Sequence, residues 1–509
     1  MTAGSSATPR ARGLACWSAA AAACLALLAP VPALALNLLQ AFEAAQRHDA
    51  QLNSARLQVA AARERLPQAG AAFRPYVDAA TSATAGRYDA DIGPARSFDN
   101  VSGAINLAFP LYRPASTAVF NQAEVGLRLA EAQLGQAAQD LVTRVAVAYF
   151  DVLSAQDAVE VSDAQRRAIS EQFESAKRNF EVGTATITDQ QEAQARLDLN
   201  AAQFAAARND LTVRNAALAQ LTGLPQDGLH ILKLEAPLLA AEPNDIERWT
   251  AQAREGSFAV QQAELLAAIA RLDIDRARYA QRPVVDLVTQ AGVLQGKTAG
   301  SIANPIDRSS TLSAGVQLSV PLYSGGGLQA RERETVAALQ GAESDLENSR
   351  RLSEQGARQA FLGLKSSAEQ ARALEAAVAS SRLALESNLL GYQVGVRINV
   401  DVLNAQQQLF STLRDLARAR YDVLLNGLRL KAIAGTLLSP DVAAVNALLS
   451  PPTGRSFPQV TAPGAVRGAG TATGATSRTA PRNAPRSAPG SAPAAVQGMP
   501  GGAAAPGPR

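Results

Sequence analysis

The apolar and polar residues of this chain follow a helical pattern over most of its length. Apolar positions recur at helical spacing, proline is absent from most of the stretches concerned, and polar residues occupy more than one face. A helix of some 65 residues would be about 100 Å long, at a rise of ~1.5 Å per residue, which suits a tube that is wet inside and outside. We expect helices at 37–72, 114–179, 186–222, 246–281, 328–391 and 398–434.

Two segments alternate instead with the period of two that β-strands have. They cover 101–109 and 312–320, and their upstream partners are expected at 76–86 and 284–293. Alternation over about nine residues suits a strand that crosses a membrane with one face toward lipid. The alternative is a half-buried hairpin of a soluble protein. The expected lipid-facing side chains are Val101, Ile105, Leu107, Phe109, Leu312, Val316, Leu318 and Val320.

The same order of elements occurs twice along the chain. Phe-Glu-Val-Gly ending at Gly183 recurs as Tyr-Gln-Val-Gly ending at Gly395, an offset of 212 positions, and Pro-Leu-Tyr at 110–112 recurs at 321–323. A near-constant offset predicts two structural repeats. The first repeat is expected at 36–223 with a strand pair at about 76–109, the second at 246–440 with a strand pair at about 284–320, and the connection at 224–245.

The N-terminal residues 1–35 have the features of a signal peptide. Two arginines precede an Ala/Leu-rich stretch, and the small-residue site Ala33–Ala35 follows it. An uncleaved membrane anchor is the alternative. Both cysteines, Cys16 and Cys24, lie in this segment, and neither has an aliphatic residue three positions before it, which disfavours an acylated N-terminus. A mature chain without cysteine has no disulfide and no thiol chemistry.

The C-terminal residues 441–509 are expected to be a disordered tail rich in Pro, Ala, Gly and Arg. From Pro451 onward the tail holds six arginines and no acidic residue. Without these six charges and the two of the presequence, the net charge of the whole chain, +3, falls to about −5 for the folded body. The basic character therefore belongs to the ends of the chain, and nucleic-acid binding is not expected.

The expected strands are too few to close a barrel within one chain. The smallest outer-membrane barrels have about eight strands, and open strand edges are not tolerated in lipid. Several copies must then share one barrel. Three copies would supply about twelve strands, whereas two would give a lumen filled by side chains.

The sequence offers no chemistry of the kind that an enzyme needs. The only two histidines, His48 and His230, are far apart in the chain, and the carboxylates are scattered along helix faces. No nucleophile and base stand at a specific spacing. We therefore expect no catalytic residue, no metal site and no cofactor.

At these motifs the sequence resembles the TolC family of outer-membrane factors. The most specific piece is Gly391–Arg397 followed by Asp401–Leu403, and Thr186–Asp189 is its counterpart in the first repeat. The resemblance covers about residues 36–440. It implies a mainly α fold with a small β part: a homotrimer with a twelve-stranded outer-membrane β-barrel, continued by a periplasmic α-barrel tunnel of twelve helices. It also implies a periplasmic adaptor and an inner-membrane ABC exporter or efflux pump as partners.

In that family a small polar network closes the periplasmic end of the tunnel. The matching residues here are Thr188 and Asp189 on one helix pair and Tyr392 and Arg397 on the other. Tyr392 could donate to the Asp189 carboxylate, and Arg397 could pair with Asp189 and bond the backbone near Thr188. The alternative is that Tyr392 and Arg397 are ordinary packing and surface residues.

The resemblance also places an acidic ring in the lumen. Asp401 fits the pattern, whereas Asn404 stands where the family often has a second acid, so a weaker ring is expected. The expected function is an outer-membrane exit duct of a tripartite machine, for type I secretion of a toxin-like protein. Small-molecule efflux is the alternative, and a periplasmic coiled-coil scaffold without a channel is the alternative of another class.

Overall fold

A computed structural model gives the fold of the chain, and all described residues lie in one unit, Met1–Val460. All but the last residue of the expected signal peptide lies outside the described residues, and so does the expected tail from 453 onward. The structure describes residues 35–89, 91, 95–225, 228–233, 236–237, 242–296 and 308–452.

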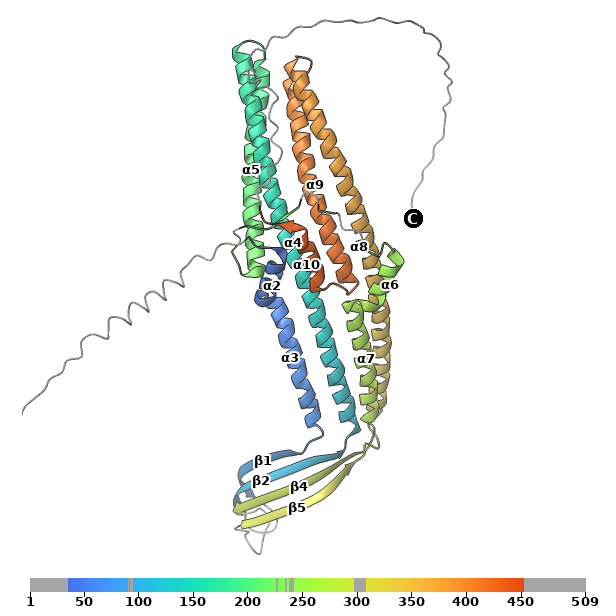
Figure 1. Cartoon of the computed structure of the whole chain (residues 1–509). Helices are drawn as coiled ribbons and strands as arrows, with labels where there is room; N and C mark the ends of the chain where they lie inside the picture. The colour runs from blue at the N-terminus through green and yellow to red at the C-terminus, as the bar shows by residue number, and fades with distance from the viewer. Residues whose placement is uncertain are drawn as a thin grey trace, which may run out of the picture. The chain divides into compact units, whose positions relative to one another are not determined.

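Long helices dominate the described residues (Figure 1). The mainly helical fold class expected from the sequence is confirmed. Within the described ranges no helix has both the length and the apolar character that crossing a bilayer would require. In chain order the helices are α2 (Leu38–His48), α3 (Ala50–Ala71), α4 (Pro114–Glu181), α5 (Ile187–Thr222), α6 (Ile246–Gly256), α7 (Phe258–Tyr279), α8 (Gly327–Gln393), α9 (Asn399–Ile433) and α10 (Ser439–Ala447).

Two helices that were expected to be continuous are each divided in two. The expected helix 37–72 is interrupted at Asp49, whose extended backbone ends α2 and whose carboxylate accepts from the Leu52 amide at 2.6 Å to begin α3. The expected helix 246–281 is interrupted at Ser257, which follows Gly256 and is also extended. Asp, Ser and Gly all disfavour a helix interior, because they cap or loosen the backbone there.

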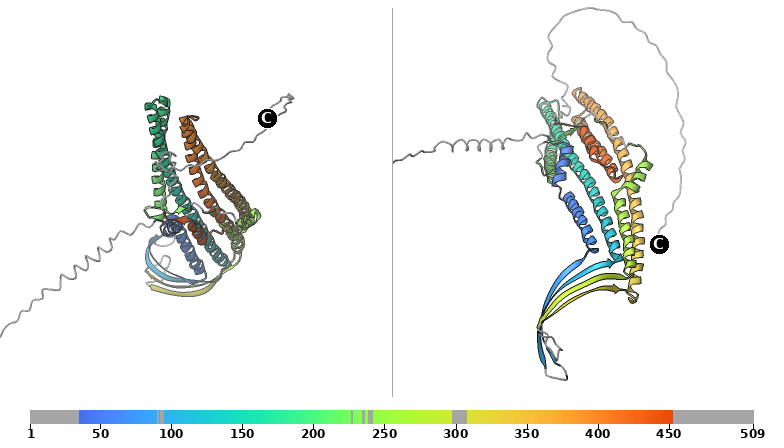
Figure 2. Two further views of the ribbon diagram at one scale, coloured as in Figure 1. Left: turned by 45° about the horizontal axis from the view of Figure 1, so that its top comes forward. Right: turned by 60° about the horizontal axis from the view of Figure 1, so that its bottom comes forward.

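Four of the strands form an antiparallel sheet at one end of the helices (Figures 1 and 2). It contains β1 (Tyr76–Tyr88), β2 (Arg96–Tyr112), β4 (Val284–Gly296) and β5 (Arg308–Ser319), in the spatial order β1-β2-β4-β5. The two expected strand pairs therefore join into one sheet through β2 and β4. Among the described residues, β1 and β5 each have a neighbouring strand on one side alone.

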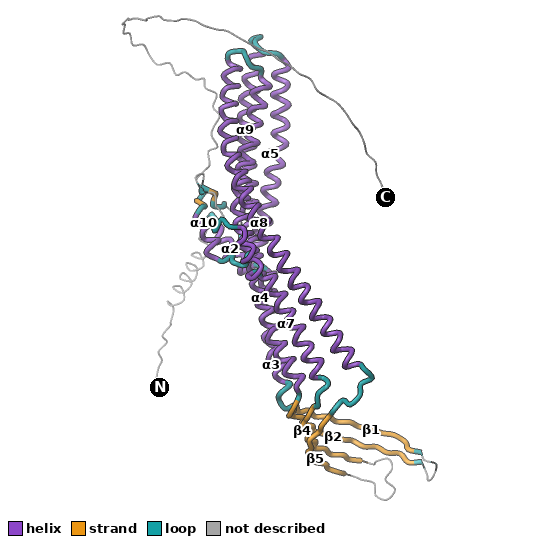
Figure 3. The backbone as a smooth tube through the Cα atoms, turned by 90° about the vertical axis from the view of Figure 1, so that its right-hand side faces the viewer, coloured by secondary structure: helices purple, strands orange, loops and turns teal. Residues whose placement is uncertain are grey.

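The long helices pack as antiparallel partners. α4 lies against α5 and α8 lies against α9, while α3 and α7 cover the parts of α4 and α8 that lead to the sheet (Figure 3). Farther from the sheet the α4–α5 and α8–α9 pairs continue as two helical hairpins (Figure 1). α4 and α9 are the main contact between the two hairpins.

The largest apolar core surrounds the middle of α4. Tyr149 is fully buried there, its ring packs edge-on against Phe150, and Phe150 stacks on Tyr421 of α9. The Tyr149 hydroxyl donates to the His230 carbonyl at 2.8 Å, with the Leu36 carbonyl at 3.1 Å as a second acceptor. Burial raises the pKa of this hydroxyl, so it stays a donor.

The chain remains ordered beyond the expected start of its tail. α10 and the short strand β6 (Leu449–Ser450) pack on the core, and β6 pairs with β3 (Ile231–Leu232) from the connection between the repeats. Val442, Val445 and Leu449 are buried. The tail boundary expected at residue 441 is therefore too early, because these apolar side chains complete the core around α2 and α4.

An ion pair joins the start of α3 to α4 and gives a pH-dependent prediction. Arg144 holds both carboxylate oxygens of the buried Asp49, at 2.9 and 3.1 Å, and thereby lowers the pKa of Asp49 below its ordinary 3.8. Because the folded pKa lies below that of the unfolded chain, this stabilisation is present above about pH 4 and is lost as pH falls through the folded pKa. Asp49→Asn keeps the cap but loses the pair, so we expect about 1–2 kcal/mol lower stability at pH 7.

Thermal unfolding followed by circular dichroism at pH 7 and at pH 3 measures this effect. The difference between Asp49→Asn and the unchanged protein should shrink at pH 3. A difference of the same size at both pH values would contradict the pairing, and Asp415→Asn, on an exposed face of α9, serves as the control.

Candidate functional site

The sheet has one apolar face and one polar face. Its register places Ala79, Ile105, Ala291 and Leu312 side by side in one row across all four strands. The next row on the same face holds Leu107. The row after that holds Phe109, Leu287 and Val316 side by side. The sheet residues predicted to face lipid are therefore brought to one face, with Val320 directly after the end of β5.

The opposite face carries polar and small side chains. Asn106 donates its amide to the Asp78 carboxylate at 2.9 Å across β1 and β2. The Ser82 and Ser102 hydroxyls lie 2.8 Å apart on the same two strands. An apolar face on one side and hydrogen-bonded polar groups on the other is the pattern of a strand between lipid and water.

The ends of the two helical hairpins farthest from the sheet have matching turns. α4 ends before Gly183 and α8 ends before Gly395, and both glycines have φ near +75°, at +78° and +76°. Such a left-handed residue after a helix is strained unless it is glycine, so both turns require this residue. The recurring Val-Gly of the sequence thus places α5 and α9 beside their partner helices.

Asp189 serves as part of a helix cap. Its carboxylate accepts from the Thr186 amide at 3.1 Å and from the Thr186 hydroxyl at 2.7 Å. The Thr188 hydroxyl lies 2.5 Å from that of Thr186. In the second repeat Ile398 replaces Thr186 and makes no such bond, so the corresponding acid, Asp401, can turn to another partner.

The expected bonds of Tyr392 and Arg397 to Asp189 are not made within the described part of a single chain. The Tyr392 hydroxyl instead accepts from the Asn179 side-chain amide at 3.3 Å. Arg397 pairs with Asp401, one helical turn away, at 3.5 Å. Within one chain the Thr186 cap and Asp401 provide the partners of these groups, and the expected bonds of Tyr392 and Arg397 to Asp189 stay a prediction.

A buried amide pair near these turns was missed by the sequence analysis. Gln172 of α4 donates to the Asn399 side-chain oxygen at 2.6 Å, and the Asn399 amide donates to the Asp189 carbonyl at 3.2 Å. Asn399 is 1% exposed. These bonds connect α4, the first turn of α5 and the start of α9. The signal was present, since Asn399 lies at helical spacing from the buried Val402 and Leu403.

Arg196 of α5 reaches across to α9. Its guanidinium donates to the Asn404 oxygen at 3.1 Å and to the Gln407 oxygen at 2.6 Å. Asn404 stands where the TolC family often has a second acid. Its side chain is therefore bonded to a cation, Arg196. The Asp401 carboxylate beside the turn is likewise paired with a cation, Arg397.

Comparison with known proteins gives a consistent result over most of the chain. The model of the outer membrane efflux protein family matches residues 41–224 and 249–436. The outer membrane protein TolC of Vibrio cholerae is 32% identical, over 81% of this chain and 93% of that protein. The alkaline protease secretion protein AprF of Pseudomonas aeruginosa is 31% identical, over 83% of this chain and 89% of that protein.

The fold is also that of solved outer-membrane proteins. The crystal structure of the outer membrane protein VceC from Vibrio cholerae superimposes with a TM-score of 0.65. The superposition covers 78% of this chain and 96% of VceC, at 20% sequence identity.

Proposed function

The chain belongs to the outer membrane efflux protein family, and we propose that it is the exit duct of a type I machine that secretes a protein. As a member of that family it is an outer-membrane channel for efflux or secretion and not an enzyme. The finer assignment to secretion rests on its likeness, over most of both chains, to a protease secretion protein.

Three copies are proposed to form the working duct. The sheet in each chain has four strands with two open edges, β1 and β5. Lipid does not tolerate such edges, so β5 of one copy would pair with β1 of the next. Three sheets give a closed barrel of about twelve strands, and the helices of three copies continue it as a tunnel.

The gate is proposed to lie at the helical turns around Gly183 and Gly395. Thr188 and Asp189 of one copy would meet Tyr392 and Arg397 of the next copy. This proposal is supported by the exposed position of the Arg397 side chain, whose ion pair among the described residues of its own chain, with Asp401, is long at 3.5 Å. Links of this kind contribute on the order of 1 kcal/mol each, so a partner protein could open them.

A periplasmic adaptor and an inner-membrane ABC exporter are the proposed partners. The sequence reveals no site at which this chain could bind an energy source, so the energy for transport would come from the exporter. Small-molecule efflux through a pump is the second candidate, since the family is named for efflux. A scaffold without a channel would have no use for a sheet with one largely apolar face.

Cells that lack this protein are compared with unchanged cells in two assays, one of secreted proteins and one of tolerance to toxic compounds, which distinguish secretion from efflux. Type I secretion predicts the loss of one or a few proteins from the culture supernatant, with their retention in the cell and unchanged tolerance of toxic compounds. An unchanged supernatant with several-fold lower tolerance of dyes, detergents or solvents would contradict secretion and support efflux.

The charge beside the gate gives a prediction on ion selectivity. Arg397 and Asp401 pair at 3.5 Å, with exposed side chains. Asp401→Ala would remove one negative charge beside the gate from every copy, so the ratio of cation to anion permeability should fall roughly twofold or more. The reversal potential in a KCl gradient measures this ratio. An unchanged reversal potential would mean that Asp401 does not face the lumen. Asp415→Ala, farther along α9, is the control.

A further inference from the structure

The two β-hairpins of the sheet have the same register. In the first hairpin Tyr76 of β1 lies opposite Ala108 of β2, and in the second Val284 of β4 lies opposite Ser319 of β5. The offsets between the hairpins are 208 (284 − 76) for the first strand and 211 (319 − 108) for the second. Each residue of β1 therefore has a counterpart in β4, and each residue of β2 has one in β5.

The strand β2 extends beyond its own hairpin because β4 lies beside it. Its pairing with β1 reaches Ala108 at this end, whereas β2 continues to Tyr112. After Ala108 the partners come from β4, where Leu287 lies opposite Phe109 and Val285 lies opposite Tyr112. The neighbouring hairpin thus keeps residues 109–112 in a strand.

The counterpart of this segment, residues 320–323, has no strand beside it among the described residues. β5 ends at Ser319, where its pairing with β4 also ends. The next residues are Val-Pro-Leu-Tyr, and Leu322 and Tyr323 are 92% and 90% exposed. Leu111 and Tyr112, their counterparts, are about half exposed. The segment is therefore a strand end that a single chain leaves without a partner.

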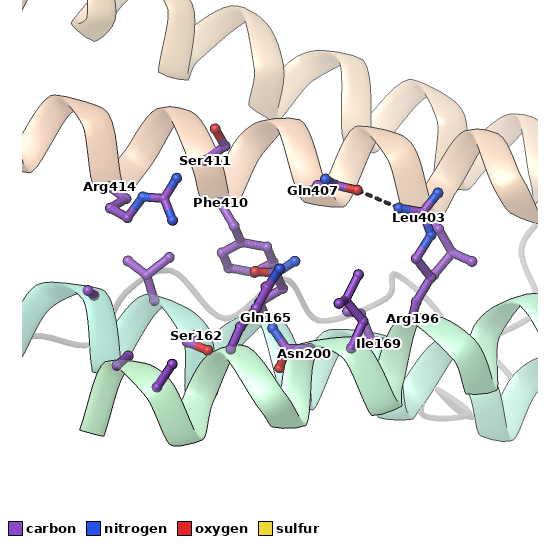
Figure 4. A pocket seen from close by; sticks show the side chains of 16 residues that line it. Ser162, Gln165, Ile169, Arg196, Asn200, Leu403, Gln407, Phe410, Ser411 and Arg414 are labelled. Carbon is purple, nitrogen blue, oxygen red and sulfur yellow. Dashed lines mark hydrogen bonds between the residues drawn. The ribbon is translucent and has the colours of Figure 1, made fainter. Parts of the chain in front are cut away.

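The long helices show a similar difference farther from the sheet. Within one chain α9 packs on α4 and α5, and the Phe410 ring projects from α9 toward them (Figure 4). Leu141 of α4 and Leu425 of α9 are buried in the largest core. Their counterparts, Leu352 of α8 (352 − 141 = 211) and Val213 of α5 (425 − 213 = 212), are 58% and 56% exposed. Two apolar positions that are buried between α4 and its neighbours are thus exposed on α8 and α5.

We propose that one copy joins the next in the register that joins the two hairpins within a chain. Ile105 of β2 lies opposite Ala291 of β4, and their counterparts are Val316 of β5 and Ala83 of β1. Val316 of one copy would therefore lie opposite Ala83 of the next copy. Residues 320–323 would become a strand against β1 of that copy. This inference rests on the proposed trimer and adds the pairing of individual residues to it.

The proposed register keeps both faces of the sheet continuous from copy to copy. Val320, the counterpart of Phe109, would lie opposite Ala79 on the apolar face. Gln317, the counterpart of Asn106, would lie opposite Ser82 on the polar face. A slip by one residue would bring apolar and polar faces together, whereas a slip by two would not. The counterpart residues therefore select one register among those that keep the faces.

The helices would follow the same relation. α4 contacts α7 and α9 within one chain, so α8 would contact α3 and α5 of the next copy. Leu352 and Val213 would then be covered by apolar side chains, as Leu141 and Leu425 are.

Disulfide trapping in the outer membrane tests the register. The expected mature chain has no cysteine, since Cys16 and Cys24 lie in the expected signal peptide. Gln317→Cys with Ser82→Cys should form a disulfide, because facing residues have Cα atoms about 4.5–5.5 Å apart. Within one chain β1 and β5 are three strand spacings apart, about 14 Å, so the disulfide must join two copies. After oxidation, most of the protein should run as covalent dimers and trimers on denaturing gels without reductant.

Two pairs displaced by two residues on the polar face are the matched controls. They combine Gln317→Cys with Ala80→Cys or with Thr84→Cys. Such diagonal neighbours are about 7–8 Å apart, beyond the usual reach of a disulfide. Each control should give at least about fivefold less covalent product than the facing pair.

A second facing pair tests the segment that follows β5. Val320→Cys with Ala79→Cys should also form a disulfide between copies, and Val320→Cys with Thr81→Cys is its displaced control. This pair lies on the other face of the sheet, so it tests the register even where the first pair does not assemble. Unheated gels verify the trimers of every variant.

Each contrary result has a separate meaning. Displaced pairs that cross-link as strongly as the facing pairs would overturn the register and leave the trimer. Trimers in which neither facing pair cross-links would overturn it as well. A disulfide from Ser82→Cys without one from Ala79→Cys would overturn the strand proposed for residues 320–323. Absence of trimers of the unchanged protein would contradict the proposed duct itself.

Discussion

Ile105→Arg should prevent most of the protein from assembling in the outer membrane. Ile105 lies in the middle of β2, in the apolar row with Ala79, Ala291 and Leu312, and more than half of its side chain is exposed in one chain. An arginine facing lipid near the midplane costs about 2–4 kcal/mol. In a trimer this cost is incurred three times, which is comparable with the whole stability of many domains.

The yield of outer-membrane trimers, from membrane fractions on unheated gels, measures this effect. Ser102→Arg is the matched control, because Ser102 lies on the polar face of the same strand, beside Ser82. It should assemble nearly as well as the unchanged protein. Equal yields of trimer from the two arginine variants would mean that the apolar face does not contact lipid.

Tyr392→Phe combined with Arg397→Ser should open the duct. The pair of changes removes a hydroxyl and a cation at the end of α8 and the turn after it, where the gate is proposed. Each link contributes on the order of 1 kcal/mol, so loss of all copies in a trimer would shift the closed state by several kcal/mol. Cells that carry the variant should become several-fold more sensitive to large antibiotics that the outer membrane excludes.

The same substitutions at the opposite end of α8 provide the control. Tyr323→Phe with Arg333→Ser changes two exposed residues near the sheet, far from the turns. This control should leave antibiotic sensitivity unchanged. Sensitivity that rises equally in both double variants would indicate general damage to the duct, and no rise in either would remove Tyr392 and Arg397 from the gate.

The periodic parts of the fold could be predicted closely, because periodicity reports which face is buried. The expected helix 114–179 is α4, Pro114–Glu181, and the expected helix 398–434 is α9, Asn399–Ile433. The strands are longer than expected, since β2 begins at Arg96. Residues 96–100 do not alternate between apolar and polar, so the period of two could not reveal them.

Features made by contacts distant in sequence could not be predicted. Tyr149 bonds to the carbonyls of Leu36 and His230, and α10 completes the same core, yet nothing local in the sequence links these segments. The bonds of Asp189 differ from the expected ones for another reason. Asp189 bonds to Thr186 in a local helix cap, which the resemblance to the TolC family did not suggest. Asn399 was overlooked because a lone asparagine is usually at the surface.

Planar-bilayer conductance tests the central claim that this chain forms a gated outer-membrane duct. The purified trimer should insert and conduct, with a small and steady single-channel conductance. The Tyr392→Phe, Arg397→Ser variant should conduct several-fold more, because its tunnel is no longer held closed. A verified, membrane-inserted trimer that conducts no current, in either form, would contradict the duct and favour a scaffold.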